Sequence, residues 1–125
     1  MDRVIEPRPD DFVEPAAERA RIVLCRACQH VLTTPKQAIE MLGRHEHTFR
    51  NPGGYSFHVA CYSDAPGCAF IGDPTLDATW FPGYAWSLAL CAKCQQHVGW
   101  RFGGSGSPPR FFGLIATRLF RAGPC

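Results

Sequence analysis

The sequence lacks a strong net charge, a long apolar run and an apolar leader. Its 125 residues include 13 lysines and arginines and 11 aspartates and glutamates, a net charge of +2. Nucleic-acid and membrane surfaces are bound by a larger positive excess, so we expect neither as a partner. No stretch is long and apolar enough to cross a bilayer, and residues 1–15 contain no signal-peptide core. We therefore expect a cytoplasmic protein, which we take to be a monomer.

Recognisable catalytic patterns are also missing. No Ser-His-Asp arrangement and no pair of carboxylates stands out along the chain. His45, His47, His58 and His97 are interpreted as isolated core or surface side chains. We therefore expect no enzymatic activity and assign no catalytic residue.

The length suits one domain. Residues 1–20 are rich in proline and charged residues and show no hydrophobic period, which predicts a flexible N-terminal arm. Residues 21–125 are predicted to form the folded domain. Glycine and proline divide this part into short apolar segments, a pattern typical of an all-β domain of antiparallel sheets.

The predicted strands are short. Residues 21–32 read as a strand, a cysteine turn and a second strand, and residues 33–42 as either a short helix or an irregular loop. A loop is expected at 73–79, and 111–120 is expected to be one final strand. The remaining predicted strands span 55–63, 68–72, 86–91 and 97–102.

Seven cysteines are many for a chain of this length. Four of them form two C-x2-C pairs, Cys25 with Cys28 and Cys91 with Cys94, and 62 residues separate the pairs. Each pair suits a tight turn that aims two sulfurs at one point, and four thiolates are the set that a structural zinc ion prefers. The sequence therefore predicts one structural Zn²⁺ that joins two distant parts of the chain.

All three tryptophans lie close together in the sequence. Trp80 and Trp86 flank a Pro-Gly turn in "WFPGYAW", and Trp100 follows in "HVGWRF". Strand alternation places Trp100 and Phe102 on one face. An ideal hairpin would turn Trp80 and Trp86 to opposite sides, so both can meet only if their segment is a bent loop. The pattern alone leaves open whether these rings fill a core or line a ligand pocket.

"WFPGYAW", "CAKC", "HVGWRF" and "FFGL", together with "CRAC" and "RNPGGY", resemble the thalidomide-binding (CULT) domain family of cereblon. The resemblance runs from Leu24 to Leu119. It implies a β-tent: two antiparallel sheets set roughly at right angles and pinned by a structural zinc ion. The large extra domain of full-length cereblon is missing from the sequence, which therefore looks like a stand-alone homologue of the bacterial kind.

The resemblance also implies a binding site for cyclic imides. Trp80, Trp86 and Trp100 would wall a cage, with Phe102 at its base and Tyr84 and Asn51 at its rim. Main-chain groups of Ala78 and Trp80 would bind the imide. The expected ligands are glutarimides of the thalidomide type, a protein C-terminus that bears a cyclic imide, and uridine.

Two other classes of protein share parts of this pattern. Methionine sulfoxide reductases of the B type have the same zinc-pinned architecture but need a nucleophilic cysteine on a late strand, where residues 111–120 have none. Yippee-like interaction modules have related zinc turns but lack the full set of tryptophans. Cys61 and Cys68 are expected to be small core residues, and Cys125 to be incidental.

Overall fold

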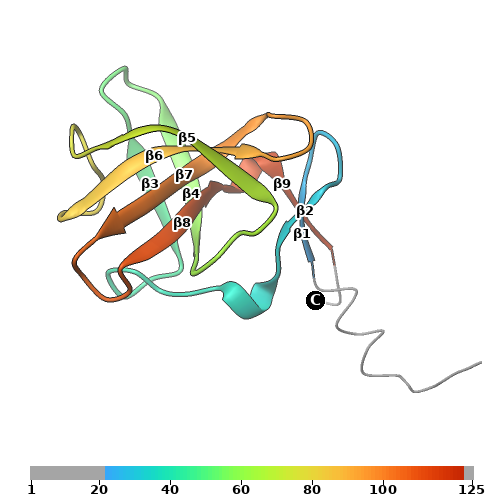
Figure 1. Ribbon diagram of the computed structural model, residues 1–125, viewed down its shortest axis with the longest axis horizontal. Coiled ribbons are helices and arrows are strands. Elements are labelled where there is room, and N and C mark those ends of the chain that lie inside the picture. The colour runs from blue at the N-terminus through green and yellow to red at the C-terminus, as the bar shows by residue number, and fades with distance from the viewer. Residues whose placement is uncertain (1–21, 123–125) are drawn as a thin grey trace, which may run out of the picture.

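The computed structural model describes residues 22–122 as two antiparallel β-sheets (Figure 1). One sheet has the strand order β2-β1-β9 and the other the order β3-β4-β8-β7-β6-β5. The strands are β1 (Ile22–Cys25), β2 (Val31–Thr33), β3 (Glu46–Arg50), β4 (Ser56–Tyr62), β5 (Cys68–Thr75), β6 (Tyr84–Cys91), β7 (His97–Gly104), β8 (Arg110–Ile115) and β9 (Leu119–Ala122). Among the described residues the only helical segments are two 3-10 turns, η1 (Pro35–Gln37) and η2 (Ala116–Arg118). The predicted all-β fold of antiparallel sheets is confirmed.

Residues 1–21 and 123–125 lie outside the part of the chain that the structure describes. The predicted arm at residues 1–20 lies outside the described residues, as does Cys125. Between residues 22 and 122, no helix has the length and apolar character that crossing a membrane requires.

Both faces of the central strands of the six-stranded sheet are buried, and β4 displays this directly. Val59 and Cys61 face one core, whereas the alternate residues Ala60 and Tyr62 face another. The inter-sheet core lies between the two sheets and consists of Val23, Cys25, Leu32, Ala60, Tyr62, Ala65, Ala89, Cys91, Val98, Phe112, Leu114 and Leu119. The aromatic core covers the opposite face and consists of Met41, Val59, Cys61, Phe81, Tyr84, Trp100, Phe102, Phe111 and Ile115.

The predicted single strand at 111–120 is wrong. The chain leaves the six-stranded sheet after Ile115, turns through η2, and enters the three-stranded sheet at Leu119. Ile115 belongs to the aromatic core and Leu119 to the inter-sheet core, so the chain has to change layers between them. No glycine or proline marks the crossing, and the apolar pattern therefore continues through it.

Several details of the predicted strands and turns differ in the structure. Strand β3 was not predicted, and the strand expected from Tyr55 begins at Ser56, with Tyr55 itself 71% exposed. Strand β5 continues to Thr75 through residues expected to be a loop. Strand β5 lies at the edge of the sheet, and its register with β6 shifts after Ile71. An irregular edge strand can contain a proline, here Pro74, because no neighbouring strand needs its N–H. The open alternative at 33–42 resolves to the short turn η1.

Candidate functional site

Four cysteines converge where the two sheets meet. The sulfurs of Cys25, Cys28, Cys91 and Cys94 all lie within 4.8 Å of one another. The Sγ atoms of Cys25 and Cys94 are 3.7 Å apart, and those of Cys28 and Cys91 are 3.5 Å apart. A tetrahedral ion with metal–sulfur bonds of about 2.3 Å separates its ligands by roughly 3.8 Å. The cluster therefore has the spacing of a tetrahedral site and could hold one metal ion.

The two cysteine turns have the same backbone. In the first, Gln29 N–H donates to the carbonyl of Cys25 at 2.7 Å, and in the second, Gln95 N–H donates to the carbonyl of Cys91 at 2.8 Å. Both glutamines adopt a left-handed conformation, with φ of 67° and 66°. A non-glycine residue seldom takes this conformation, so its occurrence at the same place in both turns marks a shared local constraint. Each turn thus presents two sulfurs by local geometry alone.

The backbone of the second turn also favours thiolate. Burial opposes ionisation of Cys91, but hydrogen bonds from the N–H groups of Cys94 and Lys93 stabilise the thiolate and lower the pKa of Cys91 to about 7. Burial raises the pKa of Cys25 to about 12. A metal ion that binds this set has to displace the remaining protons, so its affinity will rise with pH.

Two other cysteines lie among the described residues. Cys61 is fully buried in the aromatic core, and burial raises the pKa of its thiol to about 12. Cys68 is only partly buried; it packs against the inter-sheet core and lies opposite Cys91 in the sheet. Cys61 is therefore the core residue that was expected, whereas Cys68 sits at the margin of the core.

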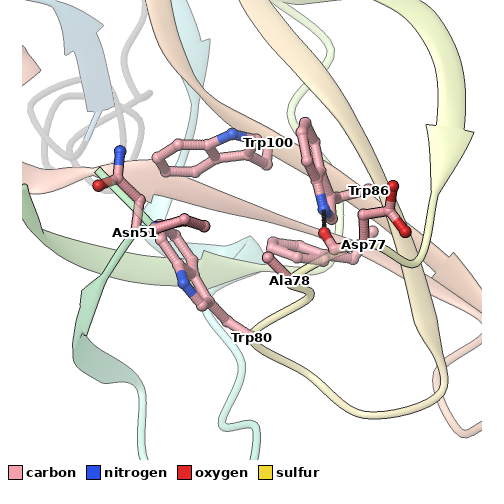
Figure 2. Close-up of a pocket in the computed structure, with 8 residues that line it drawn as sticks. Asn51, Asp77, Ala78, Trp80, Trp86 and Trp100 are labelled. Atoms are coloured by element: carbon pink, nitrogen blue, oxygen red, sulfur yellow. Dashed lines mark hydrogen bonds between the residues drawn. The ribbon is translucent and has the colours of Figure 1, made fainter. Parts of the chain in front are cut away.

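A cavity of about 370 Å³ opens on the aromatic face of the six-stranded sheet. Its lining comes from the β3–β4 loop, the loop before β6, and strands β6 and β7 (Figure 2). The lining residues are Asn51, Pro52, Asp77, Ala78, Trp80, Trp86, Trp100 and Phe102. Figure 2 shows the three indole rings around a common space. This volume lies within the range of about 300–1,000 Å³ that is usual for small-molecule sites.

The segment around the Pro-Gly pair is a bent loop and no hairpin. Tyr84 N–H donates to the carbonyl of Phe81 at 2.9 Å, and Gly83 has a φ of 88°, as a type II turn requires. Tyr84 then begins β6, which pairs with β5 and β7. Residues 76–81, directly before the turn, do not pair with β6 as a strand. Trp80 therefore escapes strand alternation and lines the same cavity as Trp86.

Packing and one hydrogen bond hold the indole rings in place. The rings of Trp80 and Trp100 meet edge to face, with centroids 4.7 Å apart and an interplanar angle of 76°. The ring of Phe49 stacks on Trp80 at 4.9 Å. Across the cavity, Trp86 donates its Nε1–H to the carbonyl of Asp77 at 2.8 Å. Each ring is thus oriented before any ligand arrives.

Several residues that line or support the cavity were not predicted from the sequence. Phe49 supports Trp80 from β3, a strand that was not predicted, and Phe57 contacts Trp100 with centroids 5.3 Å apart. Asp77 lines the cavity beside the expected residues, and Pro52 lines it next to Asn51. The pair "RN" before Pro52 and the turn signal after it indicated a loop, but no local signal indicated which side chains it would meet.

Tyr84 and Asn51 were both expected at the rim, but they differ in position. Tyr84 lies in the aromatic core, 7% exposed, and its hydroxyl donates to the carbonyl of Pro108 at 2.8 Å. It does not line the cavity. Asn51 does, and its Oδ1 accepts the N–H of Tyr55 at 2.9 Å, which fixes the β3–β4 loop.

The main chain at Ala78 and Trp80 is free to bind a ligand. Within residues 22–122, no hydrogen-bond partner occupies the N–H or carbonyl of Ala78 or the N–H of Trp80. Ala78 has a left-handed φ of 54°, a conformation that a non-glycine residue adopts at some cost. Free main-chain groups in a strained loop beside an apolar cavity can pair with polar atoms of a small ligand.

Comparison with known proteins agrees with the earlier resemblance. The chain is 36% identical to cereblon of Danio rerio over 107 residues, which are 82% of this chain and 25% of that protein. It is 34% identical to cereblon of Gallus gallus (76% and 22%) and 35% identical to cereblon of Drosophila melanogaster (78% and 18%). The chain thus spans a quarter or less of the length of these relatives, and no family model matches it. The chain therefore carries a cereblon-type (CULT) domain.

Proposed function

We propose that this domain is a zinc-braced binding module for small cyclic imides. The observation that carries the proposal is the cavity of about 370 Å³ with Trp80, Trp86 and Trp100 around it, which we call the aromatic cage. The ligands in question are glutarimides of the thalidomide type, a protein C-terminus that ends in such a ring, and uridine. The similarity to cereblon supports the same reading.

The chemistry of an imide suits the cage. The ring is small and neutral, and its flanking carbonyls make its CH₂ groups slightly positive, which favours contact with aromatic faces. Its N–H and carbonyl groups need partners, because burying one unpaired costs about 1–3 kcal/mol. The free main-chain groups of Ala78 and Trp80 are within the lining of the same cavity and supply such partners. Phe102 would form the base and Asn51 the rim.

The ring-opened form of the ligand should be excluded. Hydrolysis converts the imide into an amide and a carboxylate, and a carboxylate loses its hydration when it enters an apolar cavity. The described lining offers no basic side chain to compensate, since its one ionisable member is Asp77. The cage would thereby distinguish an intact cyclic imide from its hydrolysis product.

A structural zinc ion completes the proposal. Four thiolates would occupy every position of a tetrahedral ion and leave none for water or substrate, so the ion would brace the fold without taking part in chemistry. Such a site needs reduced thiols, which a reducing compartment such as the cytoplasm maintains. We propose no enzymatic role: outside the four-cysteine cluster, burial raises the pKa of the described thiols Cys61 and Cys68 to about 12, so neither is an available nucleophile.

One titration tests the binding function. The intrinsic fluorescence of the three tryptophans is followed while glutarimide, its ring-opened acid or uridine is added. Glutarimide is expected to change the fluorescence in a saturable manner, and the acid to bind at least about a hundredfold more weakly, because the cavity cannot solvate its charge. Equal affinity for the imide and the acid would contradict the proposal.

A further inference from the structure

The cavity has a charge preference as well as a shape. We propose that it also binds quaternary and other methylated ammonium groups, a class of ligand chemically distinct from the cyclic imides. The inference rests on the orientation of the indole rings, on the sign of the charge in the lining, and on the environment behind the cavity wall. It does not depend on imide binding.

The indole rings provide the attraction. Aromatic faces carry negative potential, and tryptophan attracts a cation more strongly than the other aromatic residues when the cation lies within about 6 Å of the ring centroid. Trp80 and Trp100 stand at 76° to each other, so they form two walls of a corner. The third ring, Trp86, is held in place by its hydrogen bond to Asp77 (Figure 2). A methylated ammonium in this space would contact several indole rings without prior rearrangement.

The lining charge has the matching sign. Among residues 22–122, Asp77 is the one ionisable residue in the lining, and no lysine, arginine or histidine of this part of the chain lines the cavity. Figure 2 shows Asp77 beside Trp86, with its main-chain oxygen turned to the indole and its carboxylate turned away. The carboxylate therefore acts on a bound cation from the edge of the cavity and not by direct contact.

The histidine behind the cavity wall is arranged to stay neutral. His97 packs edge to face against Trp100 with ring centroids 5.0 Å apart. Its Nε2–H donates to the carbonyl of Gly99 at 2.8 Å, and its Nδ1 faces the guanidinium of Arg118 at 3.3 Å, as an acceptor. Burial lowers the pKa of His97 as well. A neutral His97 adds no positive charge of its own behind Trp100, where the nearby charge is the guanidinium of Arg118.

Desolvation decides which ammonium groups enter. A primary ammonium is strongly hydrated and brings three N–H donors, more than the free carbonyl of Ala78 in this apolar lining can accept. A quaternary ammonium has no N–H donor and spreads its charge over methyl groups that suit the ring faces. The cavity should therefore prefer methylated over primary ammonium groups, and both over any anion.

The experiment compares choline with 3,3-dimethylbutan-1-ol, in which a carbon atom replaces the charged nitrogen. Both are titrated against the full chain by tryptophan fluorescence, and glutarimide is then added as a competitor. Choline is expected to bind at least about tenfold more tightly than its neutral isostere, because the two differ only in the charge that the rings recognise. Glutarimide should displace it from the shared cavity. Equal or tighter binding of the isostere would overturn the inference.

A matched pair of variants tests the part played by the lining charge. Asp77→Asn is expected to reduce choline affinity about threefold more than it reduces glutarimide affinity, since it removes charge and keeps shape. Asp73→Asn removes the same charge from β5 outside the cavity and should leave both affinities unchanged. An equal loss of choline affinity in both variants would refute the role of Asp77. Glutarimide binding without choline binding refutes this inference alone, and the reverse result refutes only the imide proposal.

Discussion

The cysteine cluster and the aromatic cavity are built in opposite ways on the same strand. Strand β6 carries Trp86 in the cavity and ends at Cys91 in the cluster. Two short turns with matching hydrogen bonds shape the cluster. The cavity instead takes its walls from loops and strands that are distant in sequence, and it depends on ring packing. Each half of the cluster is thus a product of local geometry, whereas every wall of the cavity is a product of the completed fold.

The difference predicts that the two regions fail differently. Loss of a bound ion should unfold the domain, because the ion would join the β1–β2 turn to the β6–β7 turn at the point where the two sheets meet. Loss of a cavity ring should abolish binding and leave the metal in place.

The largest effect is expected from Cys91→Ser. A structural zinc site contributes an apparent binding energy of about 10–16 kcal/mol, which matches or exceeds the roughly 5–15 kcal/mol by which a domain is usually stable. The variant should therefore be unfolded at 25 °C, as measured by circular dichroism and by metal content. Cys61→Ala removes a buried thiol outside the cluster and serves as the control that keeps both fold and metal. A folded, metal-free Cys91→Ser domain with an unchanged melting curve would show that metal binding at the cluster does not stabilise the fold.

A smaller effect on stability, but a large one on binding, is expected from Trp100→Ala. Trp100 is 9% exposed, so its truncation should lower the free energy of unfolding by about 3–5 kcal/mol. Glutarimide affinity should fall at least about a hundredfold while the metal content stays at one ion per chain.

Trp86→Ala separates binding from folding in the same experiment. Trp86 is only partly buried and lies outside the ring-to-ring contacts of the described residues, so its truncation should cost about 1–2 kcal/mol. Its loss of glutarimide affinity should nevertheless equal that of Trp100→Ala. Phe70→Ala, on the exposed edge strand β5, is the control. Retained glutarimide affinity in either tryptophan variant would contradict the proposal that the aromatic cage binds the imide.

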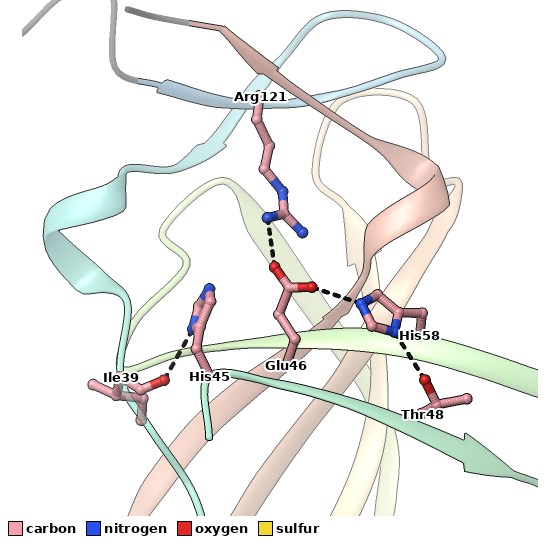
Figure 3. A network of polar contacts seen from close by, with 6 residues as sticks. All are labelled: Ile39, His45, Glu46, Thr48, His58 and Arg121. Atoms are coloured by element: carbon pink, nitrogen blue, oxygen red, sulfur yellow. Dashed lines mark hydrogen bonds and ion pairs between the residues drawn. The ribbon is translucent and has the colours of Figure 1, made fainter. Parts of the chain in front are cut away.

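The smallest effect is expected at a polar contact between strand β3 of the six-stranded sheet and strand β9 of the three-stranded sheet. Glu46 on β3 accepts hydrogen bonds from His58 at 2.6 Å and from Arg121 on β9 at 3.0 Å, and Thr48 contacts the second ring nitrogen of His58 (Figure 3). The bond from His58 and then that from Arg121 lower the pKa of Glu46 from its ordinary value of 4.5. The contact ties the hairpin that carries Asn51 to the three-stranded sheet.

Glu46→Gln should lower the free energy of unfolding by about 0.5 kcal/mol, because this contact is exposed and screened by solvent. A lowered pKa means that the contribution is present above pH 4.5 and is lost as the pH falls through the folded-state value. The difference between wild type and variant should therefore shrink as the pH falls below 4.5. Both proteins are measured with Zn²⁺ in excess, so that loss of metal at acidic pH does not enter the comparison. Exposed Glu40→Gln is the control, and a difference that grows on acidification would reverse the assigned sign.

The alternation of short apolar segments and turn residues was enough to predict antiparallel sheets. The spacing of Cys25 with Cys28 and of Cys91 with Cys94 was enough to predict two cysteine turns, because each turn is completed within a few residues. That the two turns would meet was predicted from the preference of a structural zinc ion for four thiolates. The same periodicity missed β3 and ran β8 and β9 together, since neither the polar alternation of β3 nor the change of layer after Ile115 leaves a mark in local composition.

What the sequence determined by itself is therefore whatever a few neighbouring residues can enforce: the two cysteine turns, the Pro82-Gly83 turn, and the shared face of Trp100 and Phe102. Only the tertiary structure decided that Trp80 turns toward Trp86, that Phe49 supports it, and that Tyr84 lies in the core away from the rim. The physical reason is that a loop residue takes its direction from what packs against it, and those partners lie on strands far away in the chain.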